Sequence, residues 1–192
     1  MKSFFLLLLL LFISGLLPAQ TEVASGGWSV ETDPFSTAFG AKTLSVTIEP
    51  RRPEHWSLFL NVVSADFPGW MDDFLNPKNK GKAFDPRIRL GGGFGVDYFF
   101  RPERTGTYVG LLNLFFQNEL RGSDNSVRLL THNMIPRVGY RWYPFTKLRL
   151  YLNPFVGLRY EHAFGKRWSL AEEAFTPAGL QPFGTMHIGY RF

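Results

Sequence analysis

The chain contains no cysteine, and beyond residue 20 it has no long hydrophobic run. The first absence excludes disulfides, thiol catalysis and cysteine metal sites, so stability must come from a core or from a membrane-spanning architecture. The second excludes a helical membrane protein, because a spanning helix needs about twenty consecutive apolar residues. Yet hydrophobic residues make up 45% of the chain and aromatic residues 17%, with 20 phenylalanines. These side chains must therefore lie in many short segments.

Charge is sparse as well. The 21 Lys and Arg and the 16 Asp and Glu give a formal net charge of +5, and the basic residues do not gather in one tract. A nucleic-acid-binding arm needs such a tract, so we expect no nucleic-acid partner. No linker or shift in composition divides the chain, which favours a single domain.

The first residues have the order of a secretory signal peptide. Lys2 precedes an apolar run from Phe4 to Ile13, and the small residue Ala19 follows a break in that run. The run has about ten residues, too few to span a membrane as a helix. We therefore predict a cleaved signal peptide at 1–19 and one exported domain at 20–192.

Apolar and polar side chains alternate through the exported part, which is the period of a β-strand with two different faces. In the last stretch, Leu180, Ile188 and Tyr190 share an apolar face, while Gln181 and Arg191 share the opposite, mostly polar face. Eight such stretches are present, at 28–33, 39–49, 56–66, 87–100, 108–120, 130–143, 148–161 and 180–192.

Short and long connections alternate between these stretches. The short ones read PRRPEH, RPERTG and PFTK, and the longer polar ones occupy 67–86, 121–129 and 162–179. An even number of antiparallel strands, with turns at one end and loops at the other, is typical of outer-membrane barrels. The predicted fold class is therefore all-β, a closed eight-stranded antiparallel transmembrane β-barrel.

The alternation alone does not decide which face points inward, because a soluble barrel has the same period. The polar faces carry similar numbers of arginines and carboxylates, which can pair inside a barrel while the apolar faces meet lipid. Eight strands leave an interior that side chains can fill. We predict a filled lumen with a structural network of Glu31, Asp33, Glu49, Arg87, Arg89, Asp97, Glu119, Arg137, Arg141, Arg149, Arg159, Glu161, His187 and Arg191.

Aromatic residues fall at strand ends on the apolar faces, where a girdle at the membrane interface would place them. They are Trp56, Tyr98, Phe100, Tyr108, Trp142, Tyr160, Tyr190 and Phe192.

The chain finishes GTMHIGYRF, with alternating apolar residues and a terminal Phe192. This ending resembles the closing strand of Gram-negative outer-membrane barrels, and PRVGYRWYPF at 136–145 resembles a strand running into a periplasmic turn of such proteins. The layout is similar to small eight-stranded barrels of the OmpA and OmpX type. The resemblance implies a place in the bacterial outer membrane, contact with outer-membrane lipid, and Tyr190 and Phe192 as the signal read by the barrel-assembly machinery.

No motif predicts a cofactor or a metal site. GGGFG at 91–95 continues into a strand instead of a helix, so its glycines are better explained as room for large lumen side chains than as a phosphate loop. The four histidines lack the spacing of metal ligands.

Some small outer-membrane barrels are enzymes that trim lipids with a serine, a histidine and an acidic partner near the outer rim. A deacylase-like enzyme is therefore an alternative to a non-enzymatic barrel. Its candidate residues are His162, Ser169, Glu172 and Glu173, or His132 with Ser126. Neither set has the adjacent histidine and serine expected of such enzymes, which favours a non-enzymatic protein.

The loop FPGWMDDFLNPKNKGKAFDP at 67–86 combines aromatic and basic residues. It either contacts the outer leaflet or an extracellular partner, or folds over the barrel mouth. The residues expected to make such contacts are Trp70, Phe74, Lys78, Lys80 and Lys82. We expect a structural or surface-interaction role through such loops; a soluble lipid-carrying barrel is a third interpretation.

Overall fold

The computed structural model describes residues 26–192, except 83–84, 123–124, 146–147, 166–168 and 171–172. The predicted signal peptide at 1–19 lies outside the described residues. Across the described ranges, no helix has the length and hydrophobicity that crossing a membrane requires.

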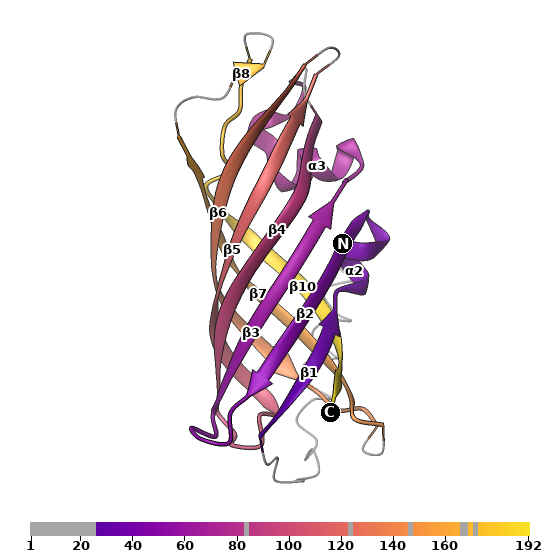
Figure 1. Cartoon of the computed structure of the whole chain (residues 1–192), viewed down its shortest axis with the longest axis vertical. Coiled ribbons are helices and arrows are strands. Elements are labelled where there is room, and N and C mark those ends of the chain that lie inside the picture. The colour runs from indigo at the N-terminus through magenta and orange to yellow at the C-terminus, as the bar shows by residue number, and fades with distance from the viewer. Residues whose placement is uncertain (1–25, 83–84, 123–124, 146–147, 166–168, 171–172) are drawn as a thin grey trace, which may run out of the picture.

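Eight antiparallel strands pair around a complete ring, which confirms the predicted closed barrel (Figure 1). Around the ring, the order is β1-β10-β7-β6-β5-β4-β3-β2. The barrel strands are β1 (Gly27–Thr32), β2 (Ala41–Glu49), β3 (Trp56–Ala65), β4 (Asp85–Phe99), β5 (Gly106–Arg121), β6 (Ser126–Arg141), β7 (Leu150–Phe164) and β10 (Leu180–Arg191). Between them lie α2 (Pro34–Ala38), α3 (Gly69–Leu75), a 3-10 helix η1 (Pro77–Asn79) and a hairpin of β8 (Ser169–Leu170) and β9 (Glu173–Ala174).

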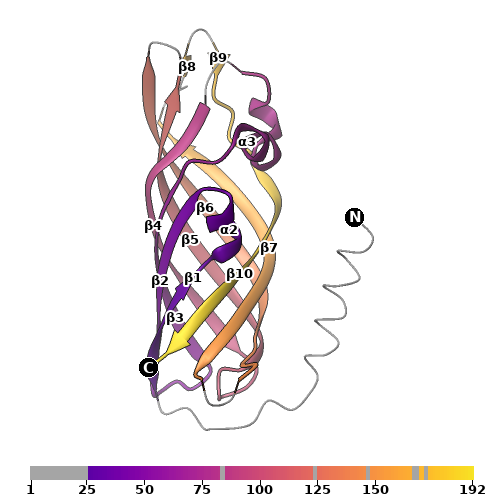
Figure 2. The ribbon, with the colours of Figure 1, turned by 90° about the vertical axis from the view of Figure 1, so that its right-hand side faces the viewer.

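The two ends of the barrel carry different connections, and we call them the turn end and the loop end. The connections β2–β3, β4–β5 and β6–β7 lie at the turn end with the C-terminus, whereas α2, α3 and the β8–β9 hairpin lie toward the loop end (Figure 2). The predicted loop at 121–129 is wrong in extent. β5 and β6 pair as far as Arg121 and Ser126, so that only 122–125 connects them.

The wall of the barrel is tall on one side and short on the other. Strands β4 to β7 have 15 or 16 residues, whereas β1 has 6 and β2 has 9. β10 pairs with β7 from Leu180 to Tyr190, but with β1 only from Ile188 to Arg191. Beyond the end of β1, α2 lies beside the upper part of β10 (Figure 2).

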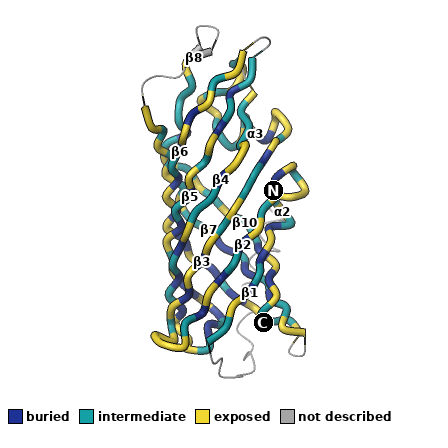
Figure 3. The backbone as a smooth tube through the Cα atoms, viewed as in Figure 1, coloured by how far each residue is buried: buried dark blue, intermediate teal, exposed yellow. Residues whose placement is uncertain are grey.

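Burial alternates along the strands, because successive side chains point to opposite faces of a sheet (Figure 3). Inward glycines provide space: a Cβ at Gly91 would overlap the Phe116 ring, and a Cβ at Gly93 would overlap the main chain of Asn113. The outward positions expose large apolar side chains, among them Leu44, Ile48, Leu58, Leu60, Val62, Phe94, Val109, Leu111, Met134, Val138, Val156, Leu158 and Ile188.

Aromatic side chains cluster on the outside of the turn end. The ring centroids of Trp56 and Tyr98 are 5.1 Å apart. Phe192 stacks on Trp28 at 4.0 Å and donates its backbone N–H to the carbonyl oxygen of the same residue at 2.9 Å, which joins the last strand to the first. The prediction that Tyr108 belongs to this outer group is wrong, because its side chain is fully buried inside the barrel.

Candidate functional site

Charged side chains fill the interior at the turn end. Glu49 bridges two arginines, with Oε1 2.5 Å from Arg141 Nη1 and Oε2 2.7 Å from Arg191 Nη2. We call the whole network the floor; it comprises Glu31, Glu49, Asp97, Arg137, Arg141, Tyr151, His187 and Arg191. Three carboxylates face three guanidinium groups, so the floor balances its own charge.

Glu31 connects the floor across the barrel. Its carboxylate accepts hydrogen bonds from the hydroxyls of Thr47 and Tyr151, each at 2.6 Å. It also lies 2.9 Å from His187 Nδ1. These contacts join β1 to β2, β7 and β10, and so connect the short side of the barrel wall to the tall side.

The arginines of the floor also stack on aromatic rings. Arg137 pairs with Asp97 through two contacts of 2.9 and 3.1 Å, and its guanidinium lies 4.6 Å from the centroid of Phe155. Arg141 lies 4.7 Å from the centroid of Tyr151. Planar guanidinium groups pack well on aromatic faces. Arg141 is only 1% exposed and Tyr151 is fully buried, so the central side chains of the floor are shielded from solvent.

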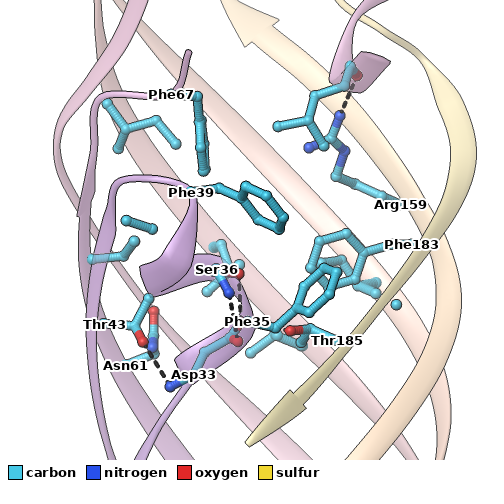
Figure 4. Close-up of a pocket in the computed structure, with 18 of the residues that line it drawn as sticks. Asp33, Phe35, Ser36, Phe39, Thr43, Asn61, Phe67, Arg159, Phe183 and Thr185 are labelled. Atoms are coloured by element: carbon cyan, nitrogen blue, oxygen red, sulfur yellow. Dashed lines mark hydrogen bonds between the residues drawn. The ribbon is translucent and has the colours of Figure 1, made fainter. Parts of the chain in front are cut away.

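Toward the loop end, the interior becomes apolar and contains a cavity of about 380 Å³ (Figure 4). His187 marks the boundary, since it bonds to Glu31 of the floor and stacks on Phe59 of the cavity wall at 5.7 Å. The wall is built from inward residues of five strands, namely Phe59, Leu112, Leu114, Ile135, Phe155 and Phe183. A concave apolar site of this size is typical of small-molecule binding.

Helix α2 covers one side of the cavity. Asp33 precedes the helix, and its carboxylate accepts the backbone N–H of Ser36 at 2.9 Å, while Pro34 occupies the first turn. Both features favour a helix start at this point. The rings of Phe35 and Phe39 then point into the cavity (Figure 4).

Helix α3 covers the loop end of the cavity, to which it contributes Trp70 and Phe74. Two side chains of the wall hold its C-terminal end: Arg159 Nη2 and Gln181 Nε2 donate to the carbonyl oxygen of Leu75 at 2.8 and 2.6 Å. Arg159 Nε is buried without a hydrogen-bond partner among the described residues. A buried guanidinium N–H beside an apolar cavity suits an acceptor group on a ligand.

The predicted lumen residues lie in different parts of the barrel. Seven of them meet in the floor: Glu31, Glu49, Asp97, Arg137, Arg141, His187 and Arg191. Asp33 and Arg159 line the cavity, and Glu161 accepts the backbone N–H of Ala178 at 2.6 Å. The prediction that Arg149 lies in the lumen is wrong, because this residue is exposed in the connection before β7 with a φ of 50°.

The predicted inward positions of Arg87 and Arg89 are also wrong. A β-bulge between Ile88 and Leu90 inserts Arg89 as an extra residue of β4. An inserted residue reverses the alternation beyond it. Ile88 consequently lines the cavity, and Arg87 turns to the outside.

Glu119 was predicted to face the lumen, but its neighbours Asn118 and Leu120 are the buried residues of this part of β5. Alternation therefore places Glu119 outward. There it lies 3.4 Å from Arg121 and 3.7 Å from Arg128, on the outer surface near the loop end.

The loop at 67–86 folds over the barrel mouth. Lys82 Nζ donates to Asn79 Oδ1 at 2.8 Å and to Thr176 Oγ1 at 3.2 Å, and Lys78 Nζ donates to a carbonyl oxygen of the same connection at 3.4 Å. These lysines thus hold two loops of the chain together. Lys80 is exposed, and Trp70 and Phe74 are 59% and 75% exposed although they line the cavity.

The histidines considered for catalysis point away from the cavity. His132 and His162 are cross-strand partners on the outside of β6 and β7, and His132 Nε2 lies 3.1 Å from Asn113 Oδ1. Ser126 begins β6 at the loop end, and neither histidine bonds to a serine within the described ranges. Glu172 lies outside those ranges, and no side-chain position is described for Ser169 or Glu173. The described residues contain no group of three or more His, Asp or Glu placed to hold a metal ion.

Sequence reasoning missed the cavity. The prediction of Tyr108 on the outward face and Glu119 on the inward face of the strand at 108–120 implied outward positions for Leu112 and Leu114, which in the structure line the cavity.

No family model and no curated protein matches the chain. Among solved structures, the chain is similar to a major outer membrane protein from Thermus thermophilus, with 17% sequence identity and a TM-score of 0.43 over 88% of this chain and 100% of that one. This likeness is too distant to carry an argument. The fold rests on the strand pairing, and the site on its own geometry.

Proposed function

We propose that the chain is an integral outer-membrane barrel that binds a small apolar molecule in the loop-end half of its interior. The outward apolar surface supports the membrane location, since side chains such as Leu58, Val138 and Leu158 are nearly half exposed on a continuous wall. A closed ring of strands also pairs its backbone groups in lipid. On this proposal, outer-membrane lipid surrounds the barrel, and the barrel-assembly machinery reads Tyr190 and Phe192.

The floor makes the barrel a barrier to ions. Its arginines and carboxylates fill the turn end, so we expect no stable channels from the purified protein in planar lipid bilayers. Stable, large conductance steps from the unaltered protein would contradict the closed floor.

The apolar cavity is the observation that carries the ligand-binding proposal. Its volume of about 380 Å³ and its lining of aromatic and aliphatic side chains suit a single aliphatic chain or a compact hydrocarbon. Burying such a ligand yields roughly 25 cal/mol for each Å² of apolar surface removed from water. The number of strands predicted a lumen filled by side chains. In our proposal, this prediction applies only to the turn-end half of the interior.

Binding is tested with a radiolabelled long-chain fatty acid and the protein in detergent solution. We expect saturable binding that the substitution Ile88→Trp lowers at least tenfold, because Ile88 lines the cavity and a larger side chain there occupies its volume. Leu90→Trp is the matched control, since Leu90 lies on the same strand and is exposed on the outside. Absence of saturable binding, or equal loss in both variants, would refute the cavity as the ligand site.

A second candidate role is contact with the outer leaflet or an extracellular partner through α3. The exposure of Trp70 and Phe74 favours it. A fluorophore on Lys80→Cys in proteoliposomes distinguishes the two contacts. Quenching by nitroxide lipids indicates that α3 rests on the bilayer, and no quenching contradicts that contact.

A further inference from the structure

The ring of strands is closed by the pairing of β1 with β10 near the turn end, but toward the loop end it has a break along one side. β1 ends at Thr32, which pairs with Ile188, so residues 180–187 of β10 have no strand on their β1 side. Pro182 lies in this segment and has no N–H to leave unpaired, as is usual for strand edges. An unpaired strand edge is rare in a barrel, because closure normally removes every edge.

The break lies at the depth of the outward apolar surface. Leu180 on β10 is 66% exposed, and its cross-strand partner Tyr160 and the neighbouring Leu158 on β7 are also exposed. In the membrane, unsatisfied backbone groups at this depth are costly unless protein covers them or a cavity adjoins them. Here α2 lies over the edge (Figure 2).

The cavity reaches the break. Pro182 and Gly184 occupy outward positions of β10, yet both line the cavity together with Phe35 of α2. Phe35 is itself half exposed. The apolar lining therefore runs continuously from the interior to the outer wall between α2 and β10.

The contacts that close this side are few. Asp33 Oδ2 accepts a hydrogen bond from Thr185 Oγ1 at 2.6 Å, and no residue of the five-residue helix α2 is buried. The loop end is closed more firmly, because Arg159 and Gln181 both bond to Leu75, and the connections above are joined by several further hydrogen bonds. The weaker closure faces the apolar outer wall.

We propose that the gap between α2 and β10 is a lateral opening through which a single-chain lipid dissolved in the outer leaflet reaches the cavity. This inference rests on the proposed function. The occupant is an aliphatic chain, since the passage and the cavity share an apolar lining and the passage opens where lipid chains lie. Outward movement of α2 breaks the bond between Asp33 and Thr185 and opens the path.

The test uses a cysteine pair across the opening, Ser36→Cys with Thr185→Cys. The hydroxyls of both residues bond to the same oxygen of Asp33, so they lie within about 5 Å of each other across the opening, and formation of the disulfide is verified by the loss of free thiols. The chain has no other cysteine. A nitroxide-labelled fatty acid added to proteoliposomes reports occupancy through the immobilised component of its electron paramagnetic resonance spectrum.

We expect the immobilised component to develop at least tenfold more slowly with the oxidised pair than after reduction of the same sample. Protein loaded first and oxidised afterwards is expected to retain the component, which shows that the disulfide closes the path and leaves the cavity intact. The control pair Asn79→Cys with Thr176→Cys links the loops at the loop end, where Asn79 already bonds to Thr176, and is expected not to slow loading.

The outcomes separate the two proposals. Equal loading rates for the oxidised and reduced Ser36–Thr185 pair, with binding still abolished by Ile88→Trp, would overturn the lateral opening and leave ligand binding intact. Slowing only by the control pair would place the path at the loop end and also overturn it. No immobilised component in any variant would overturn the proposed function itself.

Discussion

The turn-end and loop-end halves of the interior are enclosed by the same strands but contain opposite chemistry. In the floor, Glu49 and Arg141 are buried and Arg191 is partly buried, and large aromatic rings pack against Arg141. In the loop-end half, the same strands present Phe, Leu and Ile around a cavity. In our proposal, the first half closes the barrel and the second receives a ligand.

The difference lies in what occupies the inward positions. Gly139 and Gly189 face the rings of Tyr108 and Tyr151 in the floor, where a Cβ would overlap each ring. At the break near the cavity, a Cβ on Gly184 would meet its nearest atoms at 3.4 Å. Inward glycines of the loop-end half, such as Gly91 and Gly93, are packed as tightly as those near the floor, so the two halves differ in the free volume beside the apolar wall.

The largest effect is expected from Glu49→Leu. This substitution leaves Arg141 and Arg191 without their shared carboxylate, and removing one partner of a buried ion pair costs about 3–5 kcal/mol. Urea unfolding of the refolded protein, followed by tryptophan fluorescence, measures the loss.

Glu119→Leu is the control for that experiment. Its arginine partners are 37–59% exposed, so the loss is expected to stay below about 1 kcal/mol. Equal losses of unfolding free energy for Glu49→Leu and Glu119→Leu would show that the ion pairs of the floor stabilise the protein no more than solvent-exposed pairs do.

A smaller effect is expected from Gly189→Val, which forces a side chain against the ring of Tyr151. Overpacking of this kind costs about 1–3 kcal/mol. Gly184→Val should change stability much less, because a Cβ at this position meets its nearest atoms no closer than 3.4 Å. The same unfolding curves compare the two, and a reversed order would contradict the close packing of Gly189 against Tyr151.

The smallest effect is expected from Arg159→Met, and it concerns affinity. The unpartnered Nε of Arg159 suits the carboxylate of a fatty acid, so its loss should weaken fatty-acid binding about tenfold, or about 1.4 kcal/mol. A long-chain alcohol of equal length should bind both proteins alike, which controls for the bond between Arg159 and α3. Parallel losses for acid and alcohol would limit Arg159 to holding α3.

Alternation was enough to predict the strands, the closed ring and the meeting of charged residues such as Glu31, Arg137 and Arg141. Those residues lie on regular strands near the turn end, where the period of two runs without interruption. Arg87 and Arg89 were misplaced because one inserted residue on β4 reverses the faces. A bulge has no reliable signature in a single sequence.

The cavity and the break were beyond sequence reasoning for a different reason. The alternation of side chains predicts which face of the sheet a residue lies on. It does not predict how far each strand extends toward the loop end, or which residues lie across the barrel from it. The first strand was predicted at 28–33, but no helix was predicted at 34–38, where α2 lies. The free volume beside Phe183 and Phe35 lies where β1 has ended and β10 continues toward the loop end.

A photoreactive hydrocarbon dissolved in the bilayer of proteoliposomes tests the division of the barrel most directly. We predict labelling on the outward wall at Leu58, Val138 and Leu158, and in the cavity at Phe183. Tyr151 and Arg141 of the floor should stay unlabelled. Labelling of the floor as strong as that of the wall, or a wall that reacts instead with a water-soluble reagent, would contradict a lipid-facing barrel with a closed floor and an open apolar half.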